Sequence, residues 1–346
     1  MDNETRSSAG SEKLPPENKK APHSVAKVFS VAAASFAVSY IIMALAEAGI
    51  SILLEKNRPS GVFSPDSPGM MLFYSLLPIY LVGIPTAYFM LRVIPRGKIS
   101  PRRLSAKALF GYFALCFPFI FLGRLIGSTF MVLISGENAE NPVSEAVAGG
   151  DVLSAVLLVA VSPVAEELIF RKCLLDRIAG TGKETAVLFS ALCFALYHMN
   201  PGQFFYTFGM GLVLGYVYVK SARIIYPIII HMMINLYGSV VYSAVIAAIN
   251  FEKLRSVVSL MSQNSAIPDA LVSEILPGVL AIAAYYLLYL VLVGIGAVLI
   301  VFSAKKDRLK ENTGHHLNIR AFINPGMVFF LLVSVAFTLK AMIFGM

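Results

Sequence analysis

The sequence predicts an all-α membrane protein, a polytopic transmembrane bundle of eight or nine spans. Hydrophobic residues make up 57% of the 346 residues and charged residues only 14%, whereas soluble domains average about 25% charged residues. The apolar runs are continuous rather than alternating, which indicates helices and not the strands of a barrel. Several runs reach the ~20 residues that a helix needs to cross the hydrocarbon core.

The N-terminal segment differs from the rest of the chain. Residues 1–26 are polar, mixed in charge and rich in Pro, Ser, Lys and Glu, so we expect a disordered cytoplasmic tail. The first apolar run, Val28–Leu54, is too long for the core of a signal peptide and is interpreted as a retained span. Residues 27–346 are then expected to form one membrane domain.

Nine apolar runs are candidates for spans. They are Val28–Leu54, Met70–Val93, Leu109–Ile134, Val152–Leu175, Ala186–His198, Phe204–Val219, Ile224–Ile249, Ile275–Phe302 and Phe322–Phe344. The fifth run is short, with 13 residues. The sixth contains Gly209, Gly211 and Gly215, and small residues at such spacing let membrane helices approach closely.

Basic residues gather in alternate joints between the runs. The loops 95–108 and 303–321 are rich in Lys and Arg, as are the joints after the fourth and sixth runs, whereas the loop 135–151 is acidic. Nine spans with a cytoplasmic N-terminus fit this alternation. The net charge of +8 is thereby explained without nucleic acid. We expect the lipid bilayer as a partner, and a multi-pass location in the plasma membrane of a bacterium.

Ionisable residues inside spans are energetically expensive and indicate function. Three consecutive runs carry them, as Glu166-Glu167-Leu-Ile-Phe-Arg171, Phe194-Ala-Leu-Tyr-His198 and His231-Met-Met-Ile-Asn235. Glu167 and Arg171 are four residues apart and can pair on one helical face. Glu166 lies about 100° round the helix from Glu167 and can face elsewhere. His231 and Asn235 also share a face, from which both can donate hydrogen bonds to one oxyanion.

The short fifth run poses a geometric problem. Glu166 lies toward the inner end of its run, while His198 lies at the outer end of a run that spans only about 20 Å. For the two side chains to meet, we expect the fifth helix to begin on the cytoplasmic side near Gly182, or the bundle to be thin there.

The three motifs together resemble the CPBP family of CAAX prenyl proteases and bacteriocin-processing, abortive-infection-like proteins, over residues 151–240. The resemblance implies an intramembrane glutamic endopeptidase that acts on a membrane-embedded or lipidated peptide. It also implies roles for the residues at the motif positions. Glu166 with His198 activates water, His231 and Asn235 stabilise the oxyanion, and Glu167 with Arg171 supports the site.

Two other functions remain open at this stage. One is a non-catalytic membrane scaffold or bacteriocin-immunity protein of the same fold, and the other is a proton-coupled transporter. An intact set of polar residues favours the peptidase, and the lack of an internal repeat disfavours the transporter. Glu47 and Arg124 are further charges inside apolar runs, but they match no motif and are interpreted as packing or snorkelling residues.

A metal ion is the remaining question. Glu166, His198 and His231 are of the residue types that bind zinc. Asn235, by contrast, is a poor zinc ligand but a good hydrogen-bond donor. We therefore expect no cofactor, with zinc on those three residues as the alternative.

Overall fold

The computed structural model describes residues 25–57, 59–60, 64, 67–97, 99–135, 151–308 and 317–344. Every regular element within these ranges is a helix, which confirms the predicted all-α class. Most of the predicted N-terminal tail, residues 1–24, lies outside the described residues, and its last two positions begin the first helix.

Seven helical segments in the described part of the chain are long and apolar enough to cross a membrane. They are Val25–Asn57, Gly69–Leu91, Ala106–Ile134, Val152–Thr181, Ile225–Ala247, Asp269–Phe302 and Pro325–Met342. The protein is therefore an integral, multi-pass membrane protein. The fifth and sixth predicted runs form α9 (Lys183–Tyr197) and α10 (Pro201–Ser221), which are not among the seven.

The N-terminal half of the chain has long helices interrupted by π-helical turns. In chain order its elements are α1 (Val25–Asn57), α2 (Pro68–Pro78), η2 (Ile79–Gly83), α3 (Ile84–Leu91), α4 (Ala106–Ser135), α6 (Val152–Val156), η3 (Leu157–Val161), α7 (Ser162–Glu167), η4 (Leu168–Leu175), α8 (Asp176–Ile178) and η5 (Ala179–Thr181). After α9 and α10 follow α11 (Ile225–Asn235), η6 (Leu236–Val241), α12 (Tyr242–Ala247), α13 (Phe251–Ser262), α14 (Asp269–Arg308), η7 (Ile319–Ala321) and α15 (Pro325–Phe344).

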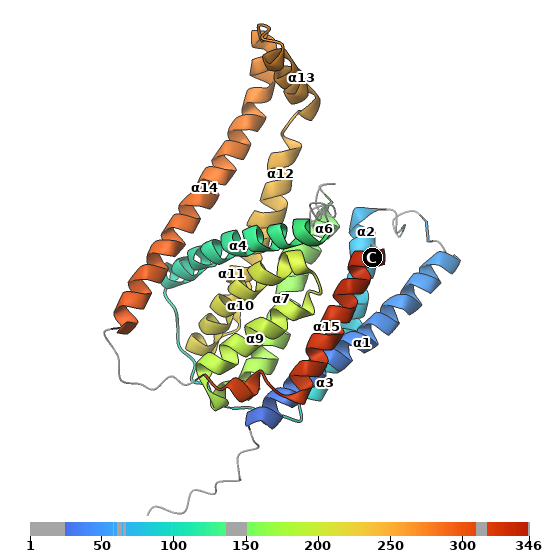
Figure 1. The fold of residues 1–346 in the computed structure, drawn as a ribbon, viewed down its shortest axis with the longest axis vertical. Coiled ribbons are helices and arrows are strands. Elements are labelled where there is room, and N and C mark those ends of the chain that lie inside the picture. The colour runs from blue at the N-terminus through green and yellow to red at the C-terminus, as the bar shows by residue number, and fades with distance from the viewer. Residues whose placement is uncertain are drawn as a thin grey trace, which may run out of the picture.

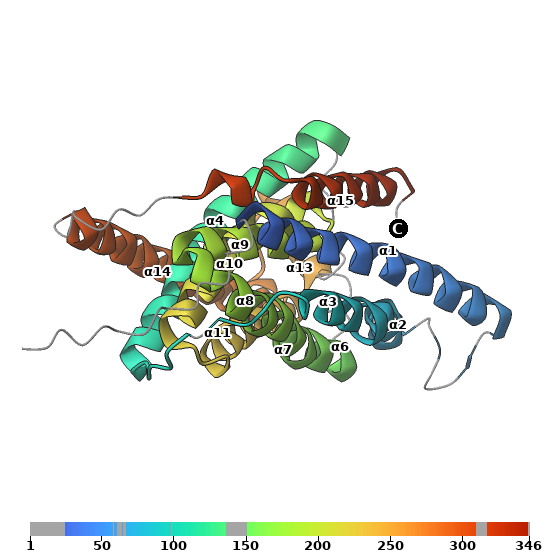
Figure 2. The same cartoon turned by 90° about the horizontal axis from the view of Figure 1, so that it is seen from below.

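The helices form a bundle with one projecting arm. Figure 1 shows α7, α9, α10 and α11 in the middle of the bundle, with α12, α13 and α14 extending away from it. In both views α1 lies beside α15, so the first and last helices are neighbours (Figure 2). The N–H of Gly326 donates to the hydroxyl of Ser30 at 2.9 Å, which fixes this pair of helices. Large apolar side chains along α14, such as Leu280, Leu287 and Leu290, are exposed, as expected of a lipid-facing surface.

Glycines bring α4 and α10 into close contact. A Cβ at Gly123 would collide with the backbone of Tyr206, and one at Gly127 with the carbonyl of Gly202. The predicted role of the glycines in the sixth run also appears here. A Cβ at Gly209 would press on Phe119 of α4, and one at Gly211 on Ala191 of α9. These contacts hold α10 between α4 and α9.

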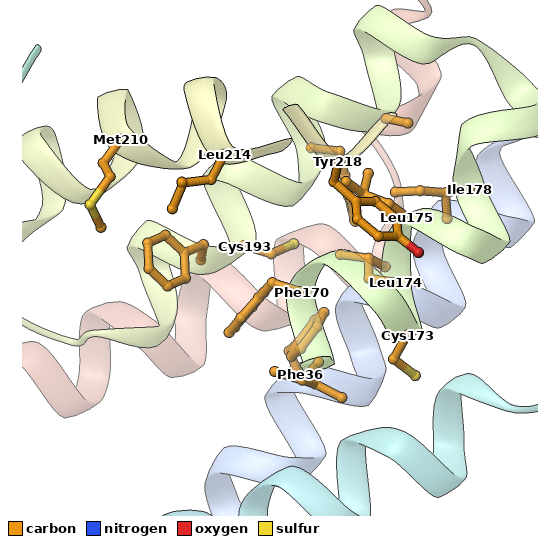
Figure 3. Close-up of a cluster of buried hydrophobic side chains, with 14 of the residues drawn as sticks. Phe36, Phe170, Cys173, Leu174, Leu175, Ile178, Cys193, Met210, Leu214 and Tyr218 are labelled. Carbon is orange, nitrogen blue, oxygen red and sulfur yellow. The ribbon is translucent and has the colours of Figure 1, made fainter. Parts of the chain in front are cut away.

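An aromatic cluster joins α1 to the helices of the motifs. Phe36 stacks on Phe170 at 5.0 Å between ring centroids, and Phe170 meets Phe194 edge to face at 5.3 Å. Figure 3 shows Phe36 and Phe170 side by side within this buried cluster. The hydroxyl of Ser39 donates to the carbonyl of Gly83 at 2.8 Å and accepts from Tyr197 at 3.0 Å. The motif-bearing segments η4 and α9 are thereby fixed against α1.

The fifth helix starts close to the position that the sequence suggested. Gly182 is its N-cap, with a φ of 133° that L-residues rarely adopt, and α9 runs from Lys183 for 15 residues. At 1.5 Å per residue α9 is about 22 Å long. His198 follows directly as its C-cap.

Candidate active site

A cavity of about 360 Å³ lies inside the bundle. Four of the six predicted site residues line it, namely Glu166 from α7, His198 from the end of α9, and His231 and Asn235 from α11. The other two, Glu167 and Arg171, are not part of its wall and are fully buried behind it. The six residues therefore form two layers, one facing the cavity and one packed in the protein.

The buried layer is an ionic cluster centred on Glu167. Its Oε2 lies 3.1 Å from Nε of Arg171, and its Oε1 accepts a hydrogen bond from Nδ1 of His231 at 2.9 Å. The side chains of Glu167 and Arg171 have no exposed surface, and that of His231 is 3% exposed. One carboxylate thus holds a guanidinium and an imidazole, and it connects the helix of the first motif to that of the third.

Arg171 is stabilised more by packing than by hydrogen bonds. Its guanidinium carbon lies 4.4 Å from the ring centroid of Phe194, the Phe of the second motif. The contact with Glu167 is short but poorly aligned, and none of the guanidinium nitrogens has a hydrogen-bond partner among the described residues. A buried cation in this setting depends on the ion pair with Glu167 and the cation–π contact.

Glu166 occupies a different environment from its neighbour. Its side chain is 25% exposed, and Oε2 lies 3.8 Å from Nε2 of His231, beyond hydrogen-bond distance. A quarter turn of the helix is enough to separate the two carboxylates in this way. Glu166 therefore faces the cavity with lone pairs available to a ligand or to water.

The tautomer of His198 follows from its hydrogen bond. Nδ1 lies 2.7 Å from the carbonyl oxygen of Phe194, which can only accept, so Nδ1 carries a hydrogen. In the neutral ring Nε2 is then an acceptor. The imidazole is within electrostatic range of both Glu166 and His231. A water held between Glu166 and His198 would therefore have two acceptors for its two hydrogens.

The chain turns sharply after His198. Met199 has a φ of 48°, a left-handed conformation that costs a non-glycine residue about 1–2 kcal/mol. Asn200 then caps α10 by accepting from the N–H of Gln203. The turn folds α10 back, so that Tyr206 and Thr207 line the same cavity as His198. Tyr197 packs against α1, where its hydroxyl bonds to Ser39, and Asn200 caps α10.

Asn235 makes a contact that the sequence did not predict. Its Nδ2 donates to the backbone carbonyl of Leu158 at 2.8 Å, across from α11 to η3. An amide nitrogen has two hydrogens, so one of them is used here and the second can still donate. The bond fixes the orientation of the side chain at the cavity wall.

Four π-helical segments surround the cavity. Each contributes to its wall, with Tyr80 from η2, Leu158 from η3, Phe170 from η4 and Tyr237 from η6. π-Helical turns are rare in proteins overall, but those that occur are often at functional sites. They interrupt the regular ladder of backbone hydrogen bonds. Three carbonyls in these segments accept from side chains of neighbouring helices instead, as Gly83 from Ser39, Leu158 from Asn235 and Phe170 from Ser190.

Tyr80 and Ser162 are cavity residues that the sequence did not single out. The hydroxyl of Tyr80 donates to that of Ser162 at 2.6 Å, and both line the cavity. Ser162 is four residues before Glu166, so it lies on the same face of α7. That spacing was a usable signal, whereas nothing in the apolar run around Tyr80 singled it out.

Glu166, His198 and His231, the residues of the zinc alternative, all line the cavity. Within the described ranges, no three His, Cys, Asp or Glu side chains are arranged to hold a metal.

Titratable and amide side chains from three helices thus meet at one cavity of a membrane-protein bundle. Residues 148–237 match the family model described as type II CAAX prenyl endopeptidase, Rce1-like. The matched segment contains all six predicted site residues. Over this segment the chain is therefore similar to a family of CAAX-type intramembrane endopeptidases, as the motifs predicted. No curated protein and no solved structure matches the chain.

Proposed function

We propose that the protein hydrolyses a peptide bond of a membrane-associated or lipidated protein or peptide, with water activated by Glu166. The observation that carries the proposal is the pairing of an accessible carboxylate, Glu166, with the acceptor nitrogen of His198 at one internal cavity. The volume of about 360 Å³ suits a short peptide segment and excludes a folded domain.

The first step is attack of water on the scissile carbonyl. Glu166 accepts one hydrogen of the water as a general base, and Nε2 of His198 accepts a hydrogen bond from the other. The water oxygen then forms a bond to the carbonyl carbon, and the carbonyl oxygen becomes an oxyanion. Two acceptors on one water fix the direction of its lone pair, which contributes by orientation.

The second step is collapse of the tetrahedral intermediate. The carbon–nitrogen bond breaks as the protonated Glu166 returns its proton to the leaving amine. The second amide hydrogen of Asn235 is suited to the oxyanion, and so is Nε2 of His231 when it carries a hydrogen. Glu167 and Arg171 have no direct part. Glu167, which is paired with Arg171, binds Nδ1 of His231, and the other ring nitrogen faces Glu166 at the cavity.

The proposed mechanism uses no metal ion. A carboxylate base, an acceptor imidazole and hydrogen-bond donors supply each proton transfer and stabilise each charge in the two steps. We therefore expect a chelator to leave the rate unchanged. Loss of activity on chelation, with recovery on addition of zinc alone, would overturn this part of the proposal.

Cleavage of membrane peptides by the purified protein tests the proposal. The protein is reconstituted in vesicles with a library of membrane-anchored peptides, with and without a C-terminal prenyl group, in water enriched in ¹⁸O. We expect products that carry one ¹⁸O in the new carboxylate and a rate about 10²- to 10⁴-fold lower for Glu166→Gln. Glu47→Gln is the matched control, because Glu47 lies in an apolar run but does not line the cavity. Folded protein that cleaves no peptide would favour the scaffold function.

A further inference from the structure

One carbonyl of the π-helical segment η3 lacks its usual backbone donor. The N–H of Ser162 donates to the carbonyl of Leu157, five residues back, as in a π-helix. The residue that would bind Leu158 in the same way is Pro163, which has no N–H. The carbonyl of Leu158 is therefore left to the side chain of Asn235, which donates to it at 2.8 Å. A proline in α7 thus explains why the amide of α11 is bound at this point of the cavity wall.

The bond to Leu158 brings Asn235 close to Ser162. Ser162 follows Leu158 by four residues, about one helical turn, and helical side chains tilt toward the preceding turn. Both Ser162 and Asn235 line the cavity, and Glu166 lies one turn further along α7. Two side chains that can donate hydrogen bonds, one from α7 and one from α11, therefore lie on the same part of the wall as the carboxylate of Glu166.

Tyr80 determines how the hydroxyl of Ser162 can be used. The Tyr80 hydroxyl donates to Oγ of Ser162 at 2.6 Å, so Ser162 accepts in this bond and keeps its own hydrogen. Within the described ranges that hydrogen has no acceptor, although Ser162 is only 6% exposed. The Tyr80 phenol is also in electrostatic range of Glu166. A buried hydroxyl that accepts one bond is a stronger donor in another, so Ser162 can donate to a ligand in the cavity.

A buried serine with only a structural role uses its hydrogen within its own helix. The hydroxyl of Ser35, for example, donates to the carbonyl of Val31 at 2.7 Å, one turn back along α1. This pattern is common for serine inside helices. For Ser162 the equivalent carbonyl is that of Leu158, which accepts from Asn235 instead. The unused hydrogen of Ser162 therefore indicates a role toward a ligand.

We propose that Ser162 is a further donor to the oxyanion, beside Asn235, and that Tyr80 is the residue that positions it. When the water activated by Glu166 attacks the scissile carbonyl, the hydroxyl of Ser162 donates a hydrogen bond to the carbonyl oxygen as this oxygen gains charge. Each hydrogen stays on its own hydroxyl, so no proton is transferred through the pair of Tyr80 and Ser162. This inference rests on the proposed function of the same cavity.

The kinetics of Ser162 variants test the role of this hydroxyl. With a peptide that the wild-type protein cleaves, Ser162→Ala should lower kcat by about 10²- to 10³-fold and change KM little, because an oxyanion donor acts in the transition state. Ser162→Thr keeps the hydroxyl and should recover most of the rate. Ser35→Ala is the control and should have the wild-type kcat, because Ser35 is buried outside the cavity. A raised KM with a normal kcat for Ser162→Ala would assign Ser162 to ground-state binding and overturn the inference.

Tyr80→Phe tests the positioning role. It removes the hydroxyl that donates to Ser162 and keeps the ring, so kcat should fall by about twofold to tenfold, less than for Ser162→Ala. In the Ser162→Ala protein the same change should lower kcat no further, because the hydroxyl that Tyr80 orients is absent. Fully independent effects of the two changes would contradict the assignment of Tyr80. Tyr88→Phe is the control, since Tyr88 lies in the same span but outside the cavity.

A binding measurement separates this inference from the proposed function. The Glu166→Gln protein, with and without Ser162→Ala, is titrated with a membrane-anchored peptide and with the same peptide carrying a phosphinate, an anionic tetrahedral group, in place of one amide. Ser162→Ala should weaken binding of the phosphinate by about tenfold to a hundredfold and that of the parent peptide little. Equal weakening of both overturns the inference. A wild-type protein that cleaves no peptide contradicts the proposed function, and the two titrations then still decide whether Ser162 binds an anionic tetrahedral group.

Discussion

Glu166 and Glu167 are adjacent in the chain, but they lie in two regions that differ in access to water. Glu167 has no exposed surface and is bound by Arg171 and His231. Glu166 is 25% exposed and faces a cavity in which His198 offers an acceptor nitrogen. One step along a helix thus separates a carboxylate in a buried ionic cluster from one that faces the cavity.

The two regions depend on each other through His231. Its Nδ1 belongs to the buried region and its Nε2 faces Glu166. Changes to the buried region should therefore affect folding first and activity as a consequence. Changes at the cavity wall should affect activity with smaller effects on folding.

Arg171→Ala should have the largest effect. It leaves the carboxylate of Glu167 buried without its cation, and removing one partner of a buried pair costs about 3–5 kcal/mol. Thermal unfolding of the protein in vesicles, followed by circular dichroism, measures the loss. Lys172→Ala is the control, since the neighbouring lysine makes a half-exposed ion pair with Asp176 at 3.0 Å, which contributes at most about 1 kcal/mol. An Arg171→Ala protein as stable as the wild type would contradict the structural role of the buried region.

Gly123→Ala should have an intermediate effect. The added methyl group collides with the backbone of Tyr206 and separates α4 from α10, for which overpacking typically costs about 1–3 kcal/mol. Because the cavity wall moves and the buried cluster does not, KM should rise more than kcat falls. Gly294→Ala on α14 serves as the control, because no atom lies within 4 Å of its added Cβ. Equal stability of the two variants would show that the helix crossing tolerates a side chain.

Asn235→Ala should have the smallest effect on stability and still reduce activity. It removes one hydrogen bond to the carbonyl of Leu158, worth about 0.5–1.5 kcal/mol. Loss of an oxyanion donor typically lowers kcat by about 10²- to 10³-fold. Asn57→Ala is the control. It removes a similar hydrogen bond, from the Asn57 amide to the carbonyl of Leu53 at 2.8 Å, on an exposed part of α1. A normal kcat for Asn235→Ala would remove this residue from the oxyanion site.

Features of the fold and site that depend on local spacing could be predicted from the sequence. Continuous apolar runs gave the all-α class, and the spacing of four residues placed Arg171 beside Glu167. The short fifth run, together with the need for His198 to reach Glu166, indicated a helix start near Gly182, where α9 begins.

Contacts between helices that are far apart in the sequence could not be predicted from local spacing. The bond from Asn235 to Leu158 requires a carbonyl that lies in a π-helical turn, and no composition signal marks such turns in an apolar run. The same holds for Tyr80, which reaches Ser162 from the π-helical segment η2. Regular spacing assumes a uniform helix, and these residues lie where the helix is not uniform.

Two variants test directly which of the two glutamates is the base. We would measure kcat and the free energy of unfolding in parallel for Glu166→Gln and Glu167→Gln. Assignment of the base to Glu166 predicts that Glu166→Gln lowers kcat by about 10²- to 10⁴-fold with the free energy of unfolding unchanged, because amide and carboxylate have the same shape. It predicts that Glu167→Gln chiefly lowers stability, because Arg171 loses its counter-ion. A stable Glu167→Gln protein without activity, beside a Glu166→Gln protein with the wild-type kcat, would contradict it.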